Sequence, residues 1–78
     1  METYKNLGGD SGVKAYEIAS NYILVKFTDN WVYKYTSNSV GMSNFSEMKR
    51  LATQGEGLNS FINTNEDVKK GYTDKYQA

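Results

Sequence analysis

The chain has 78 residues, with nine basic and nine acidic side chains, no His and no Cys. A chain of this length can bury only one modest core, and the absence of Cys excludes disulfide bonds and thiolate metal sites. Formal neutrality supplies no overall field for nucleic acid or an anionic membrane. Without His, acid–base catalysis would need a perturbed carboxylate, Lys or Tyr.

Residues 1–12 are polar and include the run GGDSG. Ordering such a segment costs much backbone entropy and buries little apolar area. We therefore expect a flexible N-terminal arm, followed by a single domain over residues 13–76. The sequence shows no apolar signal segment and no window of about 20 apolar residues that would span a membrane. These features favour a soluble, cytoplasmic protein without a membrane partner.

Residues 13–36 are rich in Val, Ile, Tyr, Phe, Trp and Thr, which is the composition of β-strands. Two pairs of turn-forming residues, Ser20-Asn21 and Asp29-Asn30, interrupt this segment. They divide it into a three-stranded antiparallel meander, with strands at about 13–19, 22–28 and 31–36.

The register of this meander follows if both turns have two residues, because Thr28 then lies opposite Trp31. One face is aliphatic at its centre, with Ile23, Val25 and Phe27. The opposite face is aromatic, with Trp31, Tyr33 and Tyr35. Neither face has the composition of an ordinary solvated surface, so the function of the rings depends on which face the helices cover.

After Thr36 the apolar residues follow helical spacing, which predicts a main helix over about 44–54. Its apolar stripe consists of Phe45, Met48, Leu51 and Ala52. Ser43 or Asn44 can cap the start of this helix, and Gly55 suits a left-handed stop at its end.

Two short helical segments are predicted after the main helix. Leu58, Phe61 and Ile62 return to the core as a helical turn. Asn65 can cap the run EDVKKG, which has its acids first and its lysines last, before Gly71. So short a helix must dock on the domain, through Val68, Tyr72 and Tyr76. The predicted fold is therefore α+β: a three-stranded antiparallel β-meander with the main helix and short C-terminal helical segments packed on the sheet.

Two motifs have a chemical interpretation that their context does not support. GDSG at residues 9–12 matches part of the sequence around a serine-protease nucleophile, but the chain has no His to act as the base for Ser11. Asn63, Asn65 and Asp67 match positions of a calcium loop, but Val68 stands where that loop needs Gly. We therefore predict no enzyme, no catalytic or metal-binding residues and no cofactor.

The run ILVKFTDNWVYKY, followed by a helix and then by GLNSFI and VKKGY, resembles the KTSC family. KTSC is a small domain named for the C-terminus of some lysyl-tRNA synthetases, and it also occurs as a stand-alone bacterial protein. The resemblance covers about residues 13–76. The matching positions are Ile23, Val25, Phe27, Tyr33, Tyr35, Gly57, Leu58, Asn59, Ile62 and Tyr72. A Val-Pro commonly follows the paired tyrosines in this family, whereas here Val40 precedes Gly41. The resemblance implies a fold rather than an activity, since RNA binding has been suggested for the family chiefly because of its attachment to a synthetase.

The aromatic stripe is the leading candidate for a function, although regularly spaced rings often belong to a core. The candidate binding residues are Trp31, Tyr33, Tyr35, Lys26, Lys34 and Arg50. Tyr is abundant at interfaces, which favours a protein-interaction or self-association domain with a protein partner or a second copy. The alternative is an RNA or single-stranded nucleic-acid binding domain, in which the rings stack on bases while Lys26 and Arg50 hold phosphates.

Overall fold

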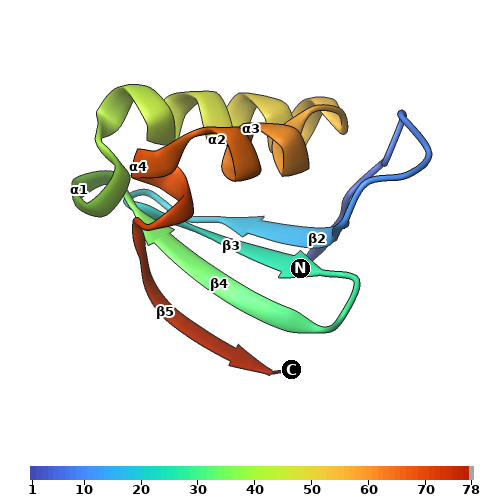
Figure 1. The fold of residues 1–78 in the computed structure, drawn as a ribbon, viewed down its shortest axis with the longest axis horizontal. Coiled ribbons are helices and arrows are strands. Elements are labelled where there is room, and N and C mark those ends of the chain that lie inside the picture. Colours follow the sequence, from blue (N-terminus) through green and yellow to red (C-terminus); the bar gives the residue numbers. More distant parts are fainter. Residues whose placement is uncertain (78) are drawn as a thin grey trace.

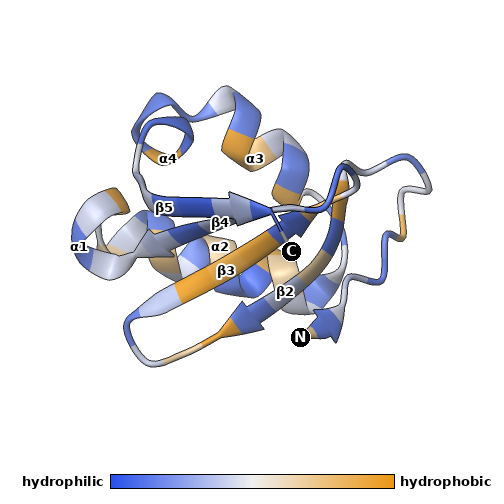
Figure 2. Cartoon of the chain, turned by 90° about the horizontal axis from the view of Figure 1, so that it is seen from below, coloured by the Kyte–Doolittle hydropathy of each residue, from blue (hydrophilic) through white to orange (hydrophobic). Residues whose placement is uncertain are grey.

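The computed structural model describes residues 1–77, which form a five-stranded antiparallel sheet covered on one face by a layer of four helices (Figure 1). The elements in chain order are β1 (Glu2–Thr3), β2 (Val13–Ile18), β3 (Tyr22–Phe27), β4 (Trp31–Thr36), α1 (Ser37–Val40), α2 (Met42–Gln54), α3 (Leu58–Thr64), α4 (Glu66–Lys69) and β5 (Tyr72–Gln77). The strand order in the sheet is β1-β2-β3-β4-β5, so β5 returns beside β4 after all the helices. Seen from below in Figure 2, no helix lies over the outer face of the sheet.

The prediction of a three-stranded sheet is wrong, although the α+β class is correct. Strands β1 and β5 extend the sheet at its two edges. β1 has only two residues and lies within the segment predicted to be an arm. β5 has the polar sequence YTDKYQ with all six residues exposed, so it lacks the apolar alternation that identifies a half-buried strand. Both strands are held by pairing with a neighbour rather than by burying an apolar face.

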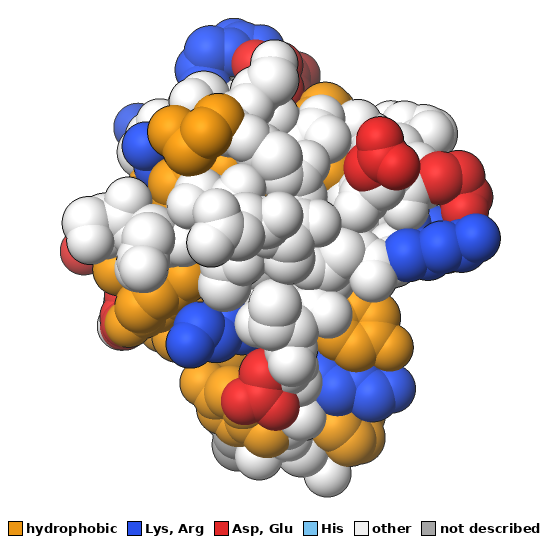
Figure 3. Space-filling view, turned by 90° about the vertical axis from the view of Figure 1, so that its left-hand side faces the viewer, with side chains coloured by type: hydrophobic (Ala, Val, Ile, Leu, Met, Phe, Trp, Pro, Cys, Tyr) orange, Lys and Arg blue, Asp and Glu red, His pale blue; other side chains and the backbone are white. Residues whose placement is uncertain are grey.

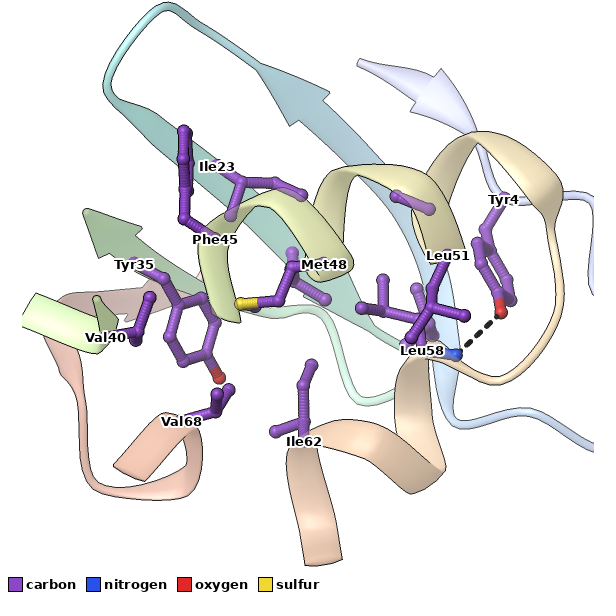
Figure 4. Packing of buried hydrophobic residues seen from close by; sticks show 13 residues of the cluster. Tyr4, Ile23, Tyr35, Val40, Phe45, Met48, Leu51, Leu58, Ile62 and Val68 are labelled. Carbon is purple, nitrogen blue, oxygen red and sulfur yellow. Dashed lines mark hydrogen bonds between the residues drawn. The ribbon is translucent and has the colours of Figure 1, made fainter. Parts of the chain in front are cut away.

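The predicted N-terminal arm also contributes a side chain to the core. Tyr4 is buried, and its backbone N–H donates to the carbonyl of Lys14 at 3.0 Å. Its hydroxyl accepts a hydrogen bond from the backbone N–H of Leu58 at 3.2 Å (Figure 4). Tyr4 therefore satisfies one of the free N–H groups at the start of α3 and joins the first residues to the helical layer.

The main helix is confirmed, and α2 buries the predicted stripe of Phe45, Met48, Leu51 and Ala52. It ends at Gly55, which has the predicted left-handed conformation with a φ of 84°. Asn44 does not cap the helix, because α2 begins at Met42. The side-chain NH₂ of Asn44 instead donates to the carbonyl of Val40 at 2.8 Å, and its side-chain oxygen accepts a hydrogen bond from the side chain of Asn65 at 3.0 Å. Asn65 caps α4 as predicted.

A short helix that the sequence analysis missed, α1, connects β4 to α2. Thr36 and Ser39 form a capping box, in which each side chain accepts a hydrogen bond from the other residue's backbone N–H. Four residues are too few to show a periodic apolar pattern, so only the capping residues mark this helix.

The β3–β4 register differs by one residue from the predicted one. Val25 lies opposite Tyr33 and Ile23 opposite Tyr35. The turn has three residues rather than two, because Asn30 alone adopts a positive φ, at 70°, and its N–H donates to the carbonyl of Phe27. A one-residue slip exchanges the two faces of a strand. Tyr33 and Tyr35 therefore lie on the same face as Ile23 and Val25, not on the opposite one.

The core lies between this face of the sheet and the helices (Figure 4). In the first hairpin the predicted pairing is observed, with Tyr16 opposite Val25 and Ile18 opposite Ile23. An irregularity between Val13 and Ala15 then turns Val13 into the core. None of the helices within residues 1–77 combines the length and apolar character that crossing a lipid bilayer requires.

Candidate binding groove

The structure places the six candidate residues on three different surfaces. Trp31, Tyr33 and Tyr35 lie on the helix-facing side of β4. Tyr33 and Tyr35 are opposite the core residues Val25 and Ile23, and Trp31 is two positions before Tyr33 on the same face of the strand. Lys26 and Lys34 lie on the outer face of the sheet, opposite Val32 and Leu24 respectively in the β3–β4 ladder. Arg50 is exposed on α2. The rings and the basic residues are therefore not brought together.

Two of the predicted basic residues have local partners. The guanidinium of Arg50 donates to the two carboxylate oxygens of Glu47 at 2.9 and 2.6 Å and to Gln54 at 2.9 Å. These hydrogen bonds hold the pKa of Glu47 below its ordinary value. The Lys34 ammonium lies 4.6 Å from the ring centre of Tyr22. On the face in Figure 3, Lys and Arg side chains lie next to Asp and Glu side chains and do not gather into one basic surface.

The three predicted rings differ in burial and belong to a larger aromatic cluster. Tyr35 is only 2% exposed and belongs to the core, whereas Trp31 and Tyr33 are half-buried. Tyr33 is the centre of the cluster, with edge-to-face contacts to Phe27 at 5.4 Å and to Tyr72 at 5.0 Å between ring centroids. Such edge-to-face pairs are favourable beyond their buried area. Tyr33 is therefore held in place while one side of the cluster remains accessible.

This cluster lines a groove of about 480 Å³ between the sheet and the C-terminal helices. The lining residues are Gly12, Phe27, Thr28, Asp29, Tyr33, Tyr35, Ile62, Asn63, Lys69 and Tyr72. We call this opening the aromatic groove. Its wall is aromatic and aliphatic, and its rim carries the polar residues Asp29, Asn63 and Lys69. A concave site with an apolar wall and a few polar groups is the usual form of a ligand site.

Sequence reasoning did not assign Ile62, Asn63, Lys69 and Tyr72 to the site. These residues lie at least 27 positions after Tyr35 in the sequence. The packing of α3 and α4 on the sheet brings Ile62, Asn63 and Lys69 to the rings, and the return of β5 beside β4 brings Tyr72. The run YTDKYQ carries little strand signal, because Asp74 and Lys75 lie between its two tyrosines. It was interpreted as a helix dock because it follows a capped helix.

A lysine of β5 that was not among the candidates lies over the rings. The Lys75 ammonium is 5.8 Å from the ring centre of Trp31, 5.9 Å from that of Tyr33 and 5.8 Å from that of Tyr72. Each distance lies near the outer limit of about 6 Å for a cation–π contact. Three rings together hold one positive charge beside the aromatic groove.

Burial raises the pKa of the Tyr35 phenol above its ordinary value, and the neighbouring Tyr33 and Tyr72 raise it further. The folded protein therefore binds this proton more tightly than the unfolded chain does, so the contribution of Tyr35 to stability is complete below pH ~10 and is lost as the pH rises above that value. We expect the wild type to lose stability in alkali more steeply than Tyr35→Phe, by at most about 1.4 kcal/mol per pH unit. Urea unfolding of both proteins between pH 8 and 11.5 measures the difference, and parallel curves would contradict it.

Asp10 and Ser11 of the GDSG segment line a separate pocket of about 250 Å³, together with other residues of the N-terminal segment and with residues 55–57, 59 and 60. The Ser11 hydroxyl accepts a hydrogen bond from the backbone N–H of Val13 at 3.0 Å, so it stabilises the loop. Within residues 1–77 no group of three or more His, Cys, Asp and Glu residues is placed to hold a metal ion. The groove is thus the best-defined candidate site.

No protein family, curated protein or solved structure matches this chain. The function is therefore inferred from the aromatic groove and the elements around it.

Proposed function

We propose that the protein is a non-enzymatic protein-interaction domain whose aromatic groove binds an extended segment of a protein partner. The observation that carries the proposal is the composition of the groove, in which four aromatic rings line one opening of about 480 Å³. Aromatic residues contribute much of the binding energy at protein interfaces, and aromatic-lined grooves are a recurrent means of binding extended peptides.

The polar groups of the groove also favour binding over catalysis. The Asp29 carboxylate accepts a hydrogen bond from the backbone N–H of Trp31 at 3.0 Å and so stabilises the β3–β4 turn. A phenol is protonated near neutral pH, and burial raises the pKa of Tyr35 further above that range. Acid–base catalysis needs a group with a pKa near the working pH, and a phenol with a raised pKa does not meet this requirement.

Two finer proposals accompany this function. The chain is a KTSC-like domain, in support of which Ile23, Val25, Tyr35, Leu58 and Ile62 all belong to the core. The protein works in the cytoplasm, a proposal that follows from the absence of Cys. Self-association through the groove is a further form of the proposal, and sedimentation velocity at micromolar concentrations tests it.

Single-stranded RNA is the second candidate ligand, because Tyr72 is 37% exposed and Lys69 lies on the rim of the groove. Stacking on an aromatic ring contributes about 1–3 kcal/mol per base. The separation of Lys26, Lys34 and Arg50 from the rings makes this candidate weaker than a protein partner.

Peptides that bind the protein are expected to depend on Tyr72. We would select binders from a phage library of random dodecapeptides and measure their affinities by fluorescence anisotropy. Tyr72→Ala should weaken binding at least about fivefold, because truncating a central aromatic residue typically costs more than about 1 kcal/mol. The matched control is Tyr22→Ala, which removes a half-buried ring from the outer face of the sheet.

Two outcomes would contradict the proposed function. In the first, Tyr72→Ala and Tyr22→Ala weaken the selected peptides equally. In the second, no peptide is enriched, while a labelled oligouridine binds at low salt and loses affinity in Tyr72→Ala. The second outcome would favour the RNA candidate.

A further inference from the structure

The last strand, β5, has an open side along which a further strand can pair. Within the part of the chain that the structure describes, β5 pairs with β4 alone, and all six of its residues are exposed. An edge strand of this kind presents unpaired backbone N–H and C=O groups. We call this open side of Tyr72–Gln77 the β5 edge.

The backbone N–H and C=O groups of Lys75 point away from β4, toward the open side of the strand. Thr73 donates its hydroxyl hydrogen to the carbonyl of Lys34 at 3.5 Å, so that carbonyl faces β5. The backbone groups of an antiparallel strand alternate in direction, so those of Lys75, opposite Tyr33, face away from β4. In agreement with this, the N–H of Lys75 donates to the side chain of Asp74 at 3.0 Å.

The β5 edge adjoins the aromatic groove. Tyr72 lines the groove, and Lys75 lies on the same face, with its ammonium over the rings of Trp31, Tyr33 and Tyr72. A strand added beside β5 would place every second side chain on this face, against Tyr72 and Lys75.

We propose that the β5 edge pairs with an extended segment of a protein partner that carries an acidic side chain opposite Lys75 and an apolar side chain beside Tyr72. This inference rests on the proposed function and specifies the chemistry of the partner. The segment would be the sixth strand of the sheet, and its backbone would accept the hydrogen bond that Lys75 now gives to Asp74. The ammonium of Lys75 is already positioned on the groove side by the three rings.

A second copy of the chain fits the β5 edge poorly. In a symmetric antiparallel pair, opposite residues must point to the same face of the sheet. A symmetric pair that meets this condition is centred on one residue, which lies opposite the same residue of the second copy. In the two registers that pair most of Tyr72–Gln77, this central residue is either Lys75 or Asp74. Like charges directly opposite each other destabilise a strand pair, so charge selects a different chain with an acid opposite Lys75.

The test uses a synthetic octapeptide in which Thr alternates with Val and Phe and one central Val is replaced by Glu. The comparison peptide has Lys in place of that Glu. We expect the Glu peptide to bind about fivefold more tightly, because opposite charges across a strand pair attract and like charges repel. Hydrogen exchange should show protection of the Lys75 amide when the Glu peptide binds the wild type.

Two variants separate strand pairing from side-chain binding. Lys75→Pro removes the outward N–H and leaves the β4 ladder intact, since a proline is tolerated where its missing N–H faces solvent. Lys75→Thr is the matched control, because it removes the charge and keeps the N–H. Lys75→Pro should bind the Glu peptide about tenfold more weakly than Lys75→Thr does. Asp74→Ala should bind the Glu peptide more tightly than the wild type does, because the backbone N–H of Lys75 then no longer donates to the Asp74 side chain.

The outcomes distinguish this inference from the proposed function. Equal affinity of Lys75→Pro and Lys75→Thr, without protection of the Lys75 amide, would overturn strand pairing, while a loss in Tyr72→Ala would still support the groove. A wild-type dimer that Lys75→Pro dissociates would make a second copy the occupant and would also overturn the inference. If Lys75→Pro fails to fold, the amide protection in the wild type decides alone.

Discussion

Tyr35→Ala is expected to lower the free energy of unfolding by about 3–5 kcal/mol, the range for removing a large aromatic ring from a core. The reason is the register of β4, which places Tyr35 opposite Ile23 on the face that the helices cover. In Figure 4 its ring extends toward Val40 and Val68. Because small domains are stable by only about 5–15 kcal/mol, this variant should be close to unfolding. Urea unfolding followed by circular dichroism measures the loss.

Two controls connect this result to the register. Tyr35→Phe keeps the ring and should cost about 1 kcal/mol or less, the usual contribution of one hydroxyl interaction. Lys34→Ala changes the preceding residue, on the outer face of the sheet, and should cost less than about 1 kcal/mol. If Tyr35→Ala costs no more than Lys34→Ala, the ring does not lie in the core, and the two-residue turn predicted from the sequence regains support.

The turn at Asp29-Asn30 explains why the sequence predicted the wrong face for the rings. Asn tolerates a positive φ in a two-residue turn and also as the last residue of a three-residue turn. The two alternatives differ by one residue in register and therefore exchange every side chain of β4 between faces. Burial of Tyr35 with the aliphatic residues of β3 selects the longer turn, and this selection involves contacts with α1, α2 and α4 that no local pattern contains.

The helices were easier to predict because their signals are local. Phe45, Met48 and Leu51 repeat at helical spacing, Gly55 provides the stop, and Asn65 caps its helix through its own side chain. The edge strands β1 and β5 have no such signal, since a strand that buries little apolar surface is stabilised mainly by its pairing partner. Predicting β5 requires knowing that the chain returns to β4.

The same distinction applies to the candidate site. Trp31, Tyr33 and Tyr35 were identified because they alternate within one strand. Tyr33 and Tyr35 line the groove, and Trp31 contacts the Lys75 ammonium beside it. The other wall depends on α3, α4 and β5, so its residues could not be assigned before the topology was known. The predicted basic residues were chosen by charge alone, and charge does not determine which surface a side chain occupies.

Gly71 lies in the connection between α4 and β5. We expect Gly71→Ala to lower the free energy of unfolding by about 3 kcal/mol, at the upper end of the cost of overpacking. A Cβ atom at this position would lie 2.7 Å from Cγ1 of Val40 and 3.2 Å from the carbonyl oxygen of Ser39, and it would also overlap the carbonyl oxygen of Asp67. Two of these three atoms belong to the backbone, and the side chain of Val40 is buried. The neighbours therefore cannot move aside without shifting α1 against α4.

The matched control for this substitution is Gly8→Ala, because its added Cβ would meet only a side-chain oxygen of Asp10, at 3.9 Å. This control should be within about 1 kcal/mol of the wild type, since replacing Gly at an unstrained position chiefly restricts the unfolded chain. Gly71 separates Lys69 on the rim of the groove from Tyr72 in its wall. Gly71→Ala should therefore also shift the NMR signals of Tyr72 and weaken peptides selected on the wild type. Equal stability of the two alanine variants would mean that α4 and β5 do not approach α1 as closely as this structure has them.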